Sequence, residues 1–311
     1  MVPAGRCLIT YEDCDGHYSK RGLRQLASGL GSLAALDYDS AGLRRQAAVQ
    51  AGKMSIQGLQ PKLSAVLEVS KGRFALVETG GRFILKPRPE LYPSAPENED
   101  LTLHLASAFG IEVPVHGLVR TRKDELCLFT RRFDRVGQRS KLALEDFAQL
   151  TGENRDTKYT SSMEKVAGVV EQYCTFPLPE KLKLFRRVLF CFVVGNEDMH
   201  LKNWSLITQD DLVQLSPAYD LLNSTILLPG TSEETALPIR GRKSNLTASD
   251  IVDYYGMERL GLPERAIEDE LRNLNAVQAR WGELIERSFT APNVQDDYRA
   301  VVRDRLSRLG I

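Results

Sequence analysis

A long apolar helix that runs straight into a polar loop does most to limit the folds open to this chain. Between Glu180 and Val194 the apolar residues recur at helical spacing, which predicts a buried central helix. Gly195 is expected to end this helix, because glycine readily adopts the left-handed conformation that closes one. The residues up to Trp204 are then mostly polar. We therefore expect this loop to start at the end of a helix that the core holds in place.

The loop carries a carboxylate and an amide five residues apart, at Asp198 and Asn203. A hairpin is predicted over residues 204–215, and it leads to a second carboxylate, Asp220. This order is typical of a metal-assisted phosphotransferase, in which one carboxylate meets the acceptor hydroxyl and the other two groups hold Mg²⁺. Pairs of Asp and Asn at this spacing also arise by chance, so the interpretation depends on the rest of the chain.

The composition is that of an ordinary globular protein, and 311 residues suffice for one large two-lobed domain or two modest ones. Lys plus Arg equals Asp plus Glu, at 41 each, so the charge gives no sign of wholesale binding to nucleic acid or an anionic membrane. The five cysteines include no CxxC pair, which argues against a zinc site. The start has only a brief apolar run and residues 188–194 are too few to span a bilayer, so we expect a cytoplasmic protein.

Short strands dominate the first part of the chain and helices the rest. Strands are expected at 63–69, 73–78, 82–86, 113–120 and 126–132, and Gly80-Gly81 predicts a hairpin between the second and third. Helices are expected at 21–30, 41–51, 97–109, 142–150, 161–174 and 180–194, and again after residue 250. This pattern predicts an α+β fold with a small, mostly antiparallel N-lobe at 1–133 and a larger helical C-lobe at 134–311.

Lys86 closes an apolar strand, which is where a kinase places the lysine that contacts the α- and β-phosphates of ATP. The alternative is an exposed lysine at a strand end. Glu97 and Glu99 follow in the first turn of the next helix, and we expect Glu99 to pair with Lys86. Both carboxylates also suit the helix dipole, so that simpler interpretation stays open.

Two further parts of an ATP site are predicted with less support from spacing. The backbone around Leu128, Phe129 and Thr130 is a candidate for adenine binding, if that strand leads to a linker between lobes; a sheet-edge strand is the alternative. Lys202 lies inside the polar loop and is a candidate for steadying the γ-phosphate, although a solvated lysine fits equally well.

Three features depart from ordinary protein kinases: no GxGxxG precedes the lysine strand, no His-Arg precedes Asp198, and Leu221-Leu222 follows Asp220 where Phe-Gly is usual. With these departures the chain resembles the HipA family of bacterial serine/threonine kinases. The resemblance covers residues 53–222 and rests on segments that come in the family's order: Ser55-Ile56-Gln57-Gly58-Leu59-Gln60-Pro61-Lys62-Leu63, Phe83-Ile84-Leu85-Lys86-Pro87, Glu97-Asn98-Glu99, Val113-Pro114-Val115-His116-Gly117-Leu118, Arg131-Arg132-Phe133-Asp134-Arg135, Gly195-Asn196-x-Asp198-x-His200-x-Lys202-Asn203 and Ser216-Pro217-x-Tyr219-Asp220.

The resemblance implies phosphorylation of a protein serine or threonine with ATP and Mg²⁺. It makes Ser55 the autophosphorylation site, with Gln57 at the position where some relatives carry a second serine. The loop 53–62 would stand in for the glycine-rich loop, with Gly58 and Gln60 at the ATP phosphates. A phosphate on Ser55 would add about −1.5 to −2 charges and draw the loop out of the nucleotide site, which would inactivate the enzyme.

Within the family the chain is most similar to the short HipT toxin kinase of HipBST toxin–antitoxin systems, which lacks most of the N-terminal subdomain of HipA. That similarity implies a type II toxin that phosphorylates an aminoacyl-tRNA synthetase, with the tryptophanyl enzyme as the expected substrate, and so inhibits translation and growth. It also implies a HipS-like small antitoxin and a HipB-like DNA-binding protein as partners, without direct nucleic-acid contact. Two alternatives remain: a catalytically silent subunit of a HipB-like repressor complex, and a small-molecule kinase on the same fold.

Overall fold

The computed structural model describes residues 5–51, 61–137, 140–228, 230 and 232–311, and it divides into two compact units. The sheet unit comprises the described residues up to Leu101, Pro114–Phe133 and Arg287–Thr290. The helical unit comprises Thr102–Val113, Asp134–Glu286 and Ala291–Ile311. The division thus departs from the expected 1–133 and 134–311 in two short segments.

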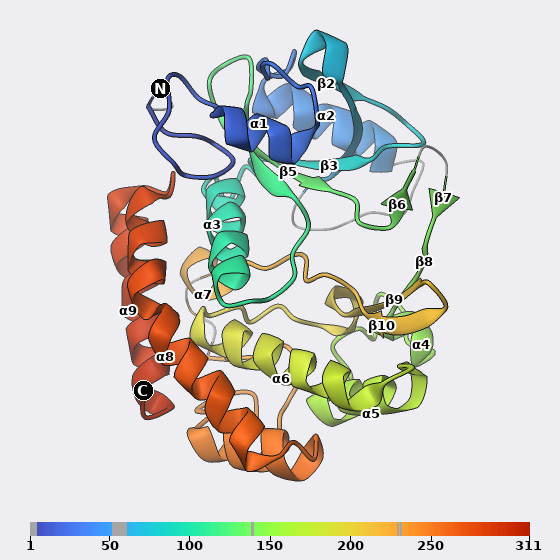
Figure 1. Ribbon diagram of the computed structural model, residues 1–311, viewed down its shortest axis with the longest axis vertical. Coiled ribbons are helices and arrows are strands. Elements are labelled where there is room, and N and C mark those ends of the chain that lie inside the picture. Colours follow the sequence, from blue (N-terminus) through green and yellow to red (C-terminus); the bar gives the residue numbers. More distant parts are fainter. Residues whose placement is uncertain (1–4, 52–60, 138–139, 229, 231) are drawn as a thin grey trace. The chain divides into compact units, whose positions relative to one another are not determined.

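The sheet unit is built on one five-stranded antiparallel sheet in the order β2-β1-β3-β5-β4 (Figure 1). Its elements are α1 (Lys20–Leu26), α2 (Ser40–Ala51), β1 (Leu63–Glu68), a 3₁₀ turn (Val69–Lys71), β2 (Arg73–Leu76), β3 (Phe83–Pro87), the first half of α3 (Ala95–Ala108), β4 (His116–Arg120) and β5 (Leu126–Arg131). The five strands and three helices expected from the sequence are confirmed here, with ends that differ by a few residues.

The pairing of the first three strands corrects one prediction. β2 pairs with β1 rather than with β3, and β3 lies along the opposite edge of β1. The turn between β1 and β2 closes at Gly72, which has the left-handed φ of 59°. Gly80-Gly81 therefore carries the chain across β1 and forms no hairpin. Gly81 is needed for that crossing, because a Cβ there would lie 1.9 Å from Ser64 Oγ of β1.

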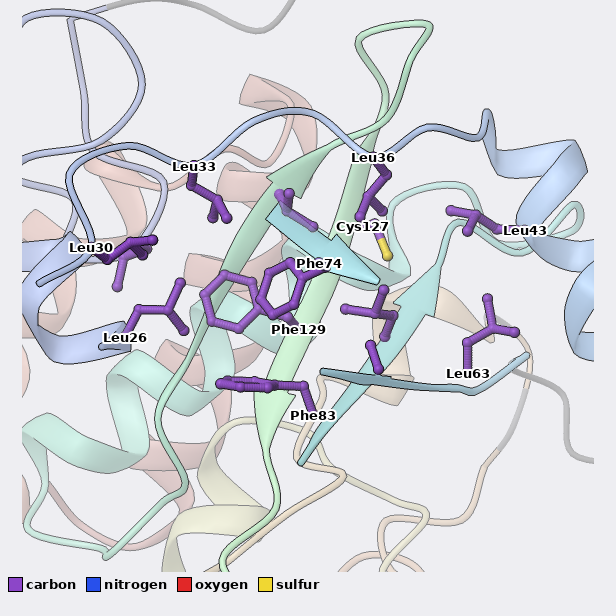
Figure 2. Close-up of a cluster of buried hydrophobic side chains, with 14 of the residues drawn as sticks. Leu26, Leu30, Leu33, Leu36, Leu43, Leu63, Phe74, Phe83, Cys127 and Phe129 are labelled. Atoms are coloured by element: carbon purple, nitrogen blue, oxygen red, sulfur yellow. The ribbon is translucent and has the colours of Figure 1, made fainter. Parts of the chain in front are cut away.

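Three phenylalanine rings, from β2, β3 and β5, form the centre of the sheet unit's core (Figure 2). The Phe74 ring lies 5.1 Å from that of Phe83 and 5.3 Å from that of Phe129, between centroids. Buried leucines from the segment 26–43 belong to the same core cluster: Leu26, Leu30, Leu33, Leu36 and Leu43. Each such side chain contributes roughly 1.5–3 kcal/mol on burial. This segment, which had no predicted role, therefore closes one face of the sheet.

The helical unit contains a three-stranded sheet, β10-β9-β8, a short pair, β6-β7, and most of the helices. Its elements are the second half of α3, β6 (Arg135–Val136), β7 (Ser140–Lys141), β8 (Ala143–Asp146), α4 (Phe147–Leu150), α5 (Met163–Tyr173), α6 (Pro177–Val193), a 3₁₀ turn (Leu201–Asn203), β9 (Ser205–Gln209), β10 (Leu212–Leu215), α7 (Ser224–Leu227), a π-helix (Ser249–Arg259), α8 (Glu264–Arg287) and α9 (Pro292–Arg308). The mixed α+β class, with an antiparallel sheet and a larger helical part, is confirmed.

The helix expected at 142–150 is wrong over its first half. Residues Ala143–Asp146 form β8 and pair with β9, and the helix α4 starts only at Phe147. The cause is a capping box: the Asp146 side chain accepts from the N–H of Gln149, whose side chain accepts from the N–H of Asp146. The predicted hairpin is confirmed as β9 and β10, and β8 extends it to three strands.

The helix α6 is the buried centre of the helical unit, as its apolar spacing predicts. The Phe190 ring packs on those of Phe109 and Trp281, with centroids 6.4 and 5.7 Å away. The indole N–H of Trp281 donates to the Leu105 carbonyl at 3.0 Å. These contacts explain why the second half of α3 belongs with the helices. Within the part of the chain that the structure describes, no helix combines the length and apolarity that crossing a membrane requires.

Candidate active site

The polar loop after α6 is anchored at its first residue. Gly195 has a left-handed φ of 69°, and its carbonyl accepts from the N–H groups of Ser224 and Thr225 at 2.9 and 3.2 Å. A Cβ on Gly195 would lie 2.6 Å from Thr225 Oγ1, so only glycine fits here without a shift of its neighbours. These hydrogen bonds attach the end of the central helix α6 to the first residues of α7, although about 30 residues of chain separate the two.

Within the loop, Asp198 and Asn203 are held together by the loop's own hydrogen bonds. The side-chain amide of Asn203 donates through Nδ2 to the Asp198 carbonyl at 2.8 Å. The N–H of Asp198 donates to Asn196 Oδ1 at 3.3 Å. Since the amide nitrogen of Asn203 is used inside the loop, its oxygen is the atom that can bind a metal. An amide oxygen and a carboxylate are the hard donors that Mg²⁺ prefers.

Asp220 lies on a segment that Tyr219 fastens to the same loop. The Tyr219 hydroxyl donates to the Lys202 carbonyl at 3.0 Å and is 2.5 Å from Ser205 Oγ. Asp220 itself has a φ of 53°, in the left-handed region that a residue other than glycine enters at a cost of order 1–3 kcal/mol. Strained backbone of this kind clusters at ligand sites. The backbone next to Asn203 and the segment that carries Asp220 are thus linked through one partly buried tyrosine.

In the sheet unit, Lys86 of β3 forms a buried ion pair with Glu99 of α3. Their side chains are 3% and 1% exposed, so Lys86 is not the exposed strand-end lysine of the alternative interpretation. Glu97 pairs instead with Arg88, and burial raises the pKa of Glu97 although the Arg88 charge opposes this. Lys86 and Glu99 are therefore positioned as a pair, and the nearby carboxylate of Glu97 is paired with Arg88 instead.

The residues proposed for adenine lie inside the sheet. Leu128, Phe129 and Thr130 pair with β3 on one side and β4 on the other, so β5 is not an edge strand. The ladder uses their backbone groups, and adenine could bind this backbone only by breaking sheet bonds. Lys202 Nζ donates to Asp146 Oδ2 at 2.7 Å and is partly exposed. Its role toward a phosphate stays a prediction.

Three predicted residues, Ser55, Gly58 and Gln60, lie outside the described residues. Nothing in the structure bears on the phosphorylation loop, and its roles stay predictions. The other candidates fall into two groups. Lys86, Glu99 and the β5 residues belong to the sheet unit, while Asp198, Lys202, Asn203 and Asp220 belong to the helical unit.

Sequence reasoning missed Tyr159, which contacts the Asp198 carboxylate directly. The Tyr159 hydroxyl donates to Asp198 Oδ1 at 2.6 Å. Its ring lies edge-on to His200, and the His200 ring accepts at Nε2 from Lys158 Nζ at 2.7 Å. Burial raises the pKa of Tyr159, and the bond to Asp198 raises it further; burial lowers the pKa of His200. No spacing or pattern in the segment 151–161 signals this contact.

Comparison with known proteins places the chain among kinase-like sequences. The model of the HipA-like C-terminal domain matches residues 54–281. A candidate kinase of Haemophilus influenzae is 32% identical over 61% of this chain and 59% of its own length. The candidate kinase Y4mE of Sinorhizobium fredii is 33% identical over 68% and 52%, and the serine/threonine-protein kinase toxin HipA of Shewanella oneidensis 25% identical over 80% and 61%. The chain spans about half to three fifths of the length of these relatives.

Two solved structures share the fold. HipA of Shewanella oneidensis, in its complex with HipB and operator DNA, matches with a TM-score of 0.70 at 19% identity, over 97% of this chain and 76% of HipA. The proinflammatory kinase CtkA of Helicobacter pylori matches with a TM-score of 0.52 at 16% identity, over 73% of this chain and 86% of CtkA. At these identities the likeness concerns the fold, and it confirms the kinase-like architecture expected from the sequence.

Proposed function

Since this chain belongs to the family of HipA-like C-terminal domains, we propose that it is an ATP-dependent protein serine/threonine kinase. One observation carries the proposal. The Tyr219 hydroxyl donates to the carbonyl of Lys202, the neighbour of Asn203, and the next residue, Asp220, has left-handed backbone. This contact ties the segment that ends at Asp220 to the loop that bears Asp198 and Asn203, and it supports a shared metal site for Asn203 and Asp220.

The proposed reaction needs few groups of the protein. Asp198 would orient the acceptor hydroxyl and take its proton, while the bond from the acceptor oxygen to the γ-phosphorus forms and the bond from that phosphorus to the β-phosphate oxygen breaks, releasing ADP. Asn203 and Asp220 would hold Mg²⁺, which when bound neutralises phosphate charge. Lys86, held by Glu99, would bind phosphate oxygens, and Lys202 would steady the γ-phosphate.

The biological setting is proposed by similarity. We take the chain to be a toxin kinase that acts on an aminoacyl-tRNA synthetase, with the tryptophanyl enzyme as first candidate, and that modifies its own Ser55. A HipB-like partner is supported by the Shewanella HipA structure, which contains HipB. A HipS-like antitoxin is proposed from the resemblance of the sequence alone.

Phosphate transfer by the purified chain tests the proposal directly. The chain is incubated with Mg²⁺ and ATP, with and without tryptophanyl-tRNA synthetase, and phosphosites are mapped by mass spectrometry. We expect phosphate on the synthetase and on Ser55. Asp198→Ala should abolish both, whereas Asp253→Ala, which removes an exposed carboxylate of the same unit, should not.

Two other outcomes are informative. Phosphate on Ser55 alone would keep the kinase and refute the substrate. Absence of phosphate on protein and small molecules alike would refute the kinase and favour a catalytically silent subunit of a repressor complex.

A further inference from the structure

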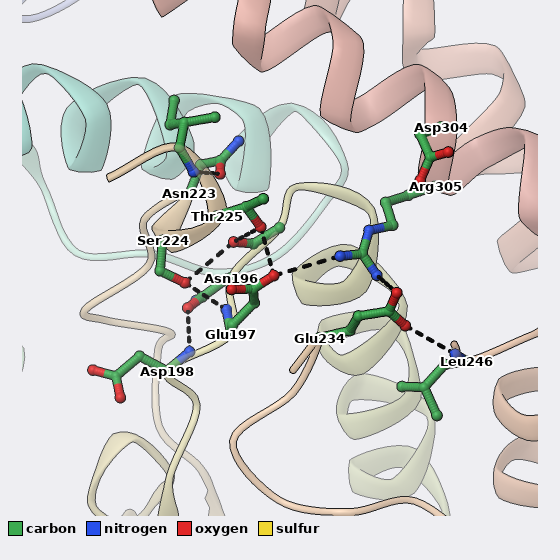
Figure 3. Close-up of polar contacts among 12 residues, drawn as sticks. Asn196, Glu197, Asp198, Asn223, Ser224, Thr225, Glu234, Leu246, Asp304 and Arg305 are labelled. Atoms are coloured by element: carbon green, nitrogen blue, oxygen red, sulfur yellow. Dashed lines mark hydrogen bonds and ion pairs between the residues drawn. The ribbon is translucent and has the colours of Figure 1, made fainter. Parts of the chain in front are cut away.

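Glu197, the residue before Asp198, has an ionic partner 108 residues further along the chain. Arg305 of α9 forms ion pairs with two carboxylates (Figure 3). Its Nη2 lies 3.4 Å from Glu197 Oε1, and its Nη1 lies 2.9 Å from Glu234 Oε1. The side chains of Arg305 and Glu197 are 7% and 9% exposed. Water therefore screens this contact poorly, and the guanidinium joins two carboxylates from separate segments.

Glu197 is also held through its backbone and its own carboxylate. Its N–H donates to Ser224 Oγ at 2.7 Å, and its Oε1 accepts from Thr225 Oγ1 at 2.7 Å. Figure 3 shows these bonds and that of Asp198 to Asn196 on the next residue. Hydrogen bonds thus hold the backbone at both Glu197 and Asp198. Movement of Glu197 would therefore move the Asp198 carboxylate.

We propose that Arg305 is a positioning residue for phosphate transfer, which acts by fixing Glu197 and with it the backbone that carries Asp198. The inference rests on the proposed function, because it assigns Asp198 to the acceptor hydroxyl. The position requires arginine: a planar guanidinium binds two carboxylates through separate nitrogens, whereas a lysine offers one. The Arg305 guanidinium also lies over the Phe192 ring of α6, 5.0 Å from its centroid, which fixes its plane.

The same helix supplies a matched control. Arg308 lies one turn further on, pairs with Glu234 and lies 5.3 Å from the centroid of the same Phe192 ring. Within the described part of the chain, the polar partners of Arg308 are Glu234, Asp304 and the Leu246 carbonyl, and Glu197 is not among them. Both arginines thus hold the helix α9 in a similar way, and only Arg305 reaches the loop. Comparing Arg305→Met with Arg308→Met therefore separates positioning of Asp198 from support of the helix.

Three measurements test the inference on the full chain: steady-state kinetics for ATP and the acceptor, urea unfolding, and hydrogen exchange of the peptide that covers 195–200. We expect Arg305→Met to lower kcat by about 10- to 100-fold, the range that follows from misplacing a reacting group by up to about 1 Å. The KM for ATP should change little, and exchange in the loop should rise. Arg308→Met should keep kcat and the exchange of the loop close to those of the parent.

Three further variants show whether a loss of kcat comes from misfolding. Arg305→Lys keeps the charge and should give an intermediate kcat. Glu197→Gln should lower kcat as Arg305→Met does, and the double variant should be little worse than either, because both act through one contact.

Equal kcat in Arg305→Met and Arg308→Met, or additive losses in the double variant, would overturn the inference while leaving the kinase intact. If the parent chain transfers no phosphate, the proposed function fails, and hydrogen exchange alone then decides whether Arg305 fixes the loop. Unchanged exchange in Arg305→Met would refute it.

Discussion

Tyr159 places a hydroxyl on the Asp198 carboxylate, which an acceptor hydroxyl would have to reach in the proposed reaction. Its bond to Asp198 Oδ1, at 2.6 Å, is the bond that a serine or threonine would make before transfer. The Lys158 ammonium lies 4.8 Å from the centroid of the Tyr159 ring, and the His200 ring packs against it. Tyr159 is nevertheless 42% exposed, so it can leave without opening a core. In the proposed reaction, Tyr159 and the acceptor hydroxyl would therefore compete for Asp198 Oδ1.

Replacing Tyr159 by Phe should favour the acceptor. A hydrogen bond to a charged group contributes about 1.5 kcal/mol, so we expect kcat/KM for the protein acceptor to rise about tenfold. The KM for ATP should stay the same. Tyr173→Phe changes an exposed tyrosine on α5 and serves as the control. An unchanged kcat/KM in Tyr159→Phe would refute competition between the hydroxyl and the acceptor, and a lower kcat/KM would mean that the hydroxyl helps to orient Asp198.

The buried pair of Lys86 and Glu99 gives a prediction about stability that does not depend on activity. Lys86→Met removes the cation that compensates a buried carboxylate, and we expect a loss of about 3–5 kcal/mol in the free energy of unfolding. The double variant Lys86→Met/Glu99→Gln should recover part of this loss. Urea unfolding measures both. Lys71→Met, which breaks a solvent-exposed pair with Glu68, should leave the free energy of unfolding nearly unchanged, because water screens that pair.

The elements differ in how far the sequence could predict them. The helix α6 and the hairpin of β9 and β10 follow from local periodicity, and so does the Gly195 terminus. The β1–β2 pairing does not, because Gly80-Gly81 is compatible with either a turn or a crossing, and the pairing of β1 with both β2 and β3 is a tertiary feature. The strand β8 was missed for a related reason: its pairing with β9 is a contact between distant segments.

Replacing Gly195 and Gly282 by alanine should change the stability of the chain in opposite directions. Gly195→Ala brings a Cβ to 2.6 Å from Thr225 Oγ1 in a left-handed conformation, so we expect a loss of stability of about 1–3 kcal/mol. Gly282 lies inside α8 with open space around it, and Gly282→Ala should stabilise the chain by about 0.5–1 kcal/mol. Thermal unfolding of both variants checks the contrast. Equal shifts would show that the tight junction at Gly195 can relax.

For the whole molecule, acid stability should depend on Glu234. Burial alone would raise the pKa of Glu234, but hydrogen bonds from Arg308 and from the N–H of Leu246, with the Arg305 charge, hold the pKa below its ordinary 4.5. As pH falls, Glu234 therefore binds a proton in the unfolded chain before it does so in the folded chain. The stabilisation is present above about pH 4.5 and is lost as pH falls through the lower pKa of the folded state.

Glu234→Gln removes that dependence. We expect a variant that is less stable than the parent at pH 7 and whose free energy of unfolding falls less steeply between about pH 5 and pH 3. Urea unfolding across this range measures it. Glu283→Gln, which removes an exposed partner of Arg280, should give a curve parallel to that of the parent. Parallel curves for Glu234→Gln as well would contradict the assignment.

The candidate site was predictable where its residues lie close in sequence. Asp198 and Asn203 share one loop, and the order of strand and helix suggested Lys86 and Glu99. Tyr159 and Arg305 reach the loop only through the tertiary fold, and no single sequence carries a signal for such contacts. The prediction that the backbone of Leu128, Phe129 and Thr130 binds adenine has a similar limit. The sequence of a strand does not tell whether other strands pair with both of its edges.

The division of the chain between the units has a consequence for synthesis on the ribosome. The sheet unit takes in Arg287, which donates to the Tyr11 carbonyl at 2.7 Å and pairs with Asp13. Translation completes Arg287 276 residues after Tyr11, when most of the helical unit has been synthesised. The first unit to start folding therefore cannot be completed until most of the second has been made. A chaperone would meet an unfinished sheet unit for most of the time of translation.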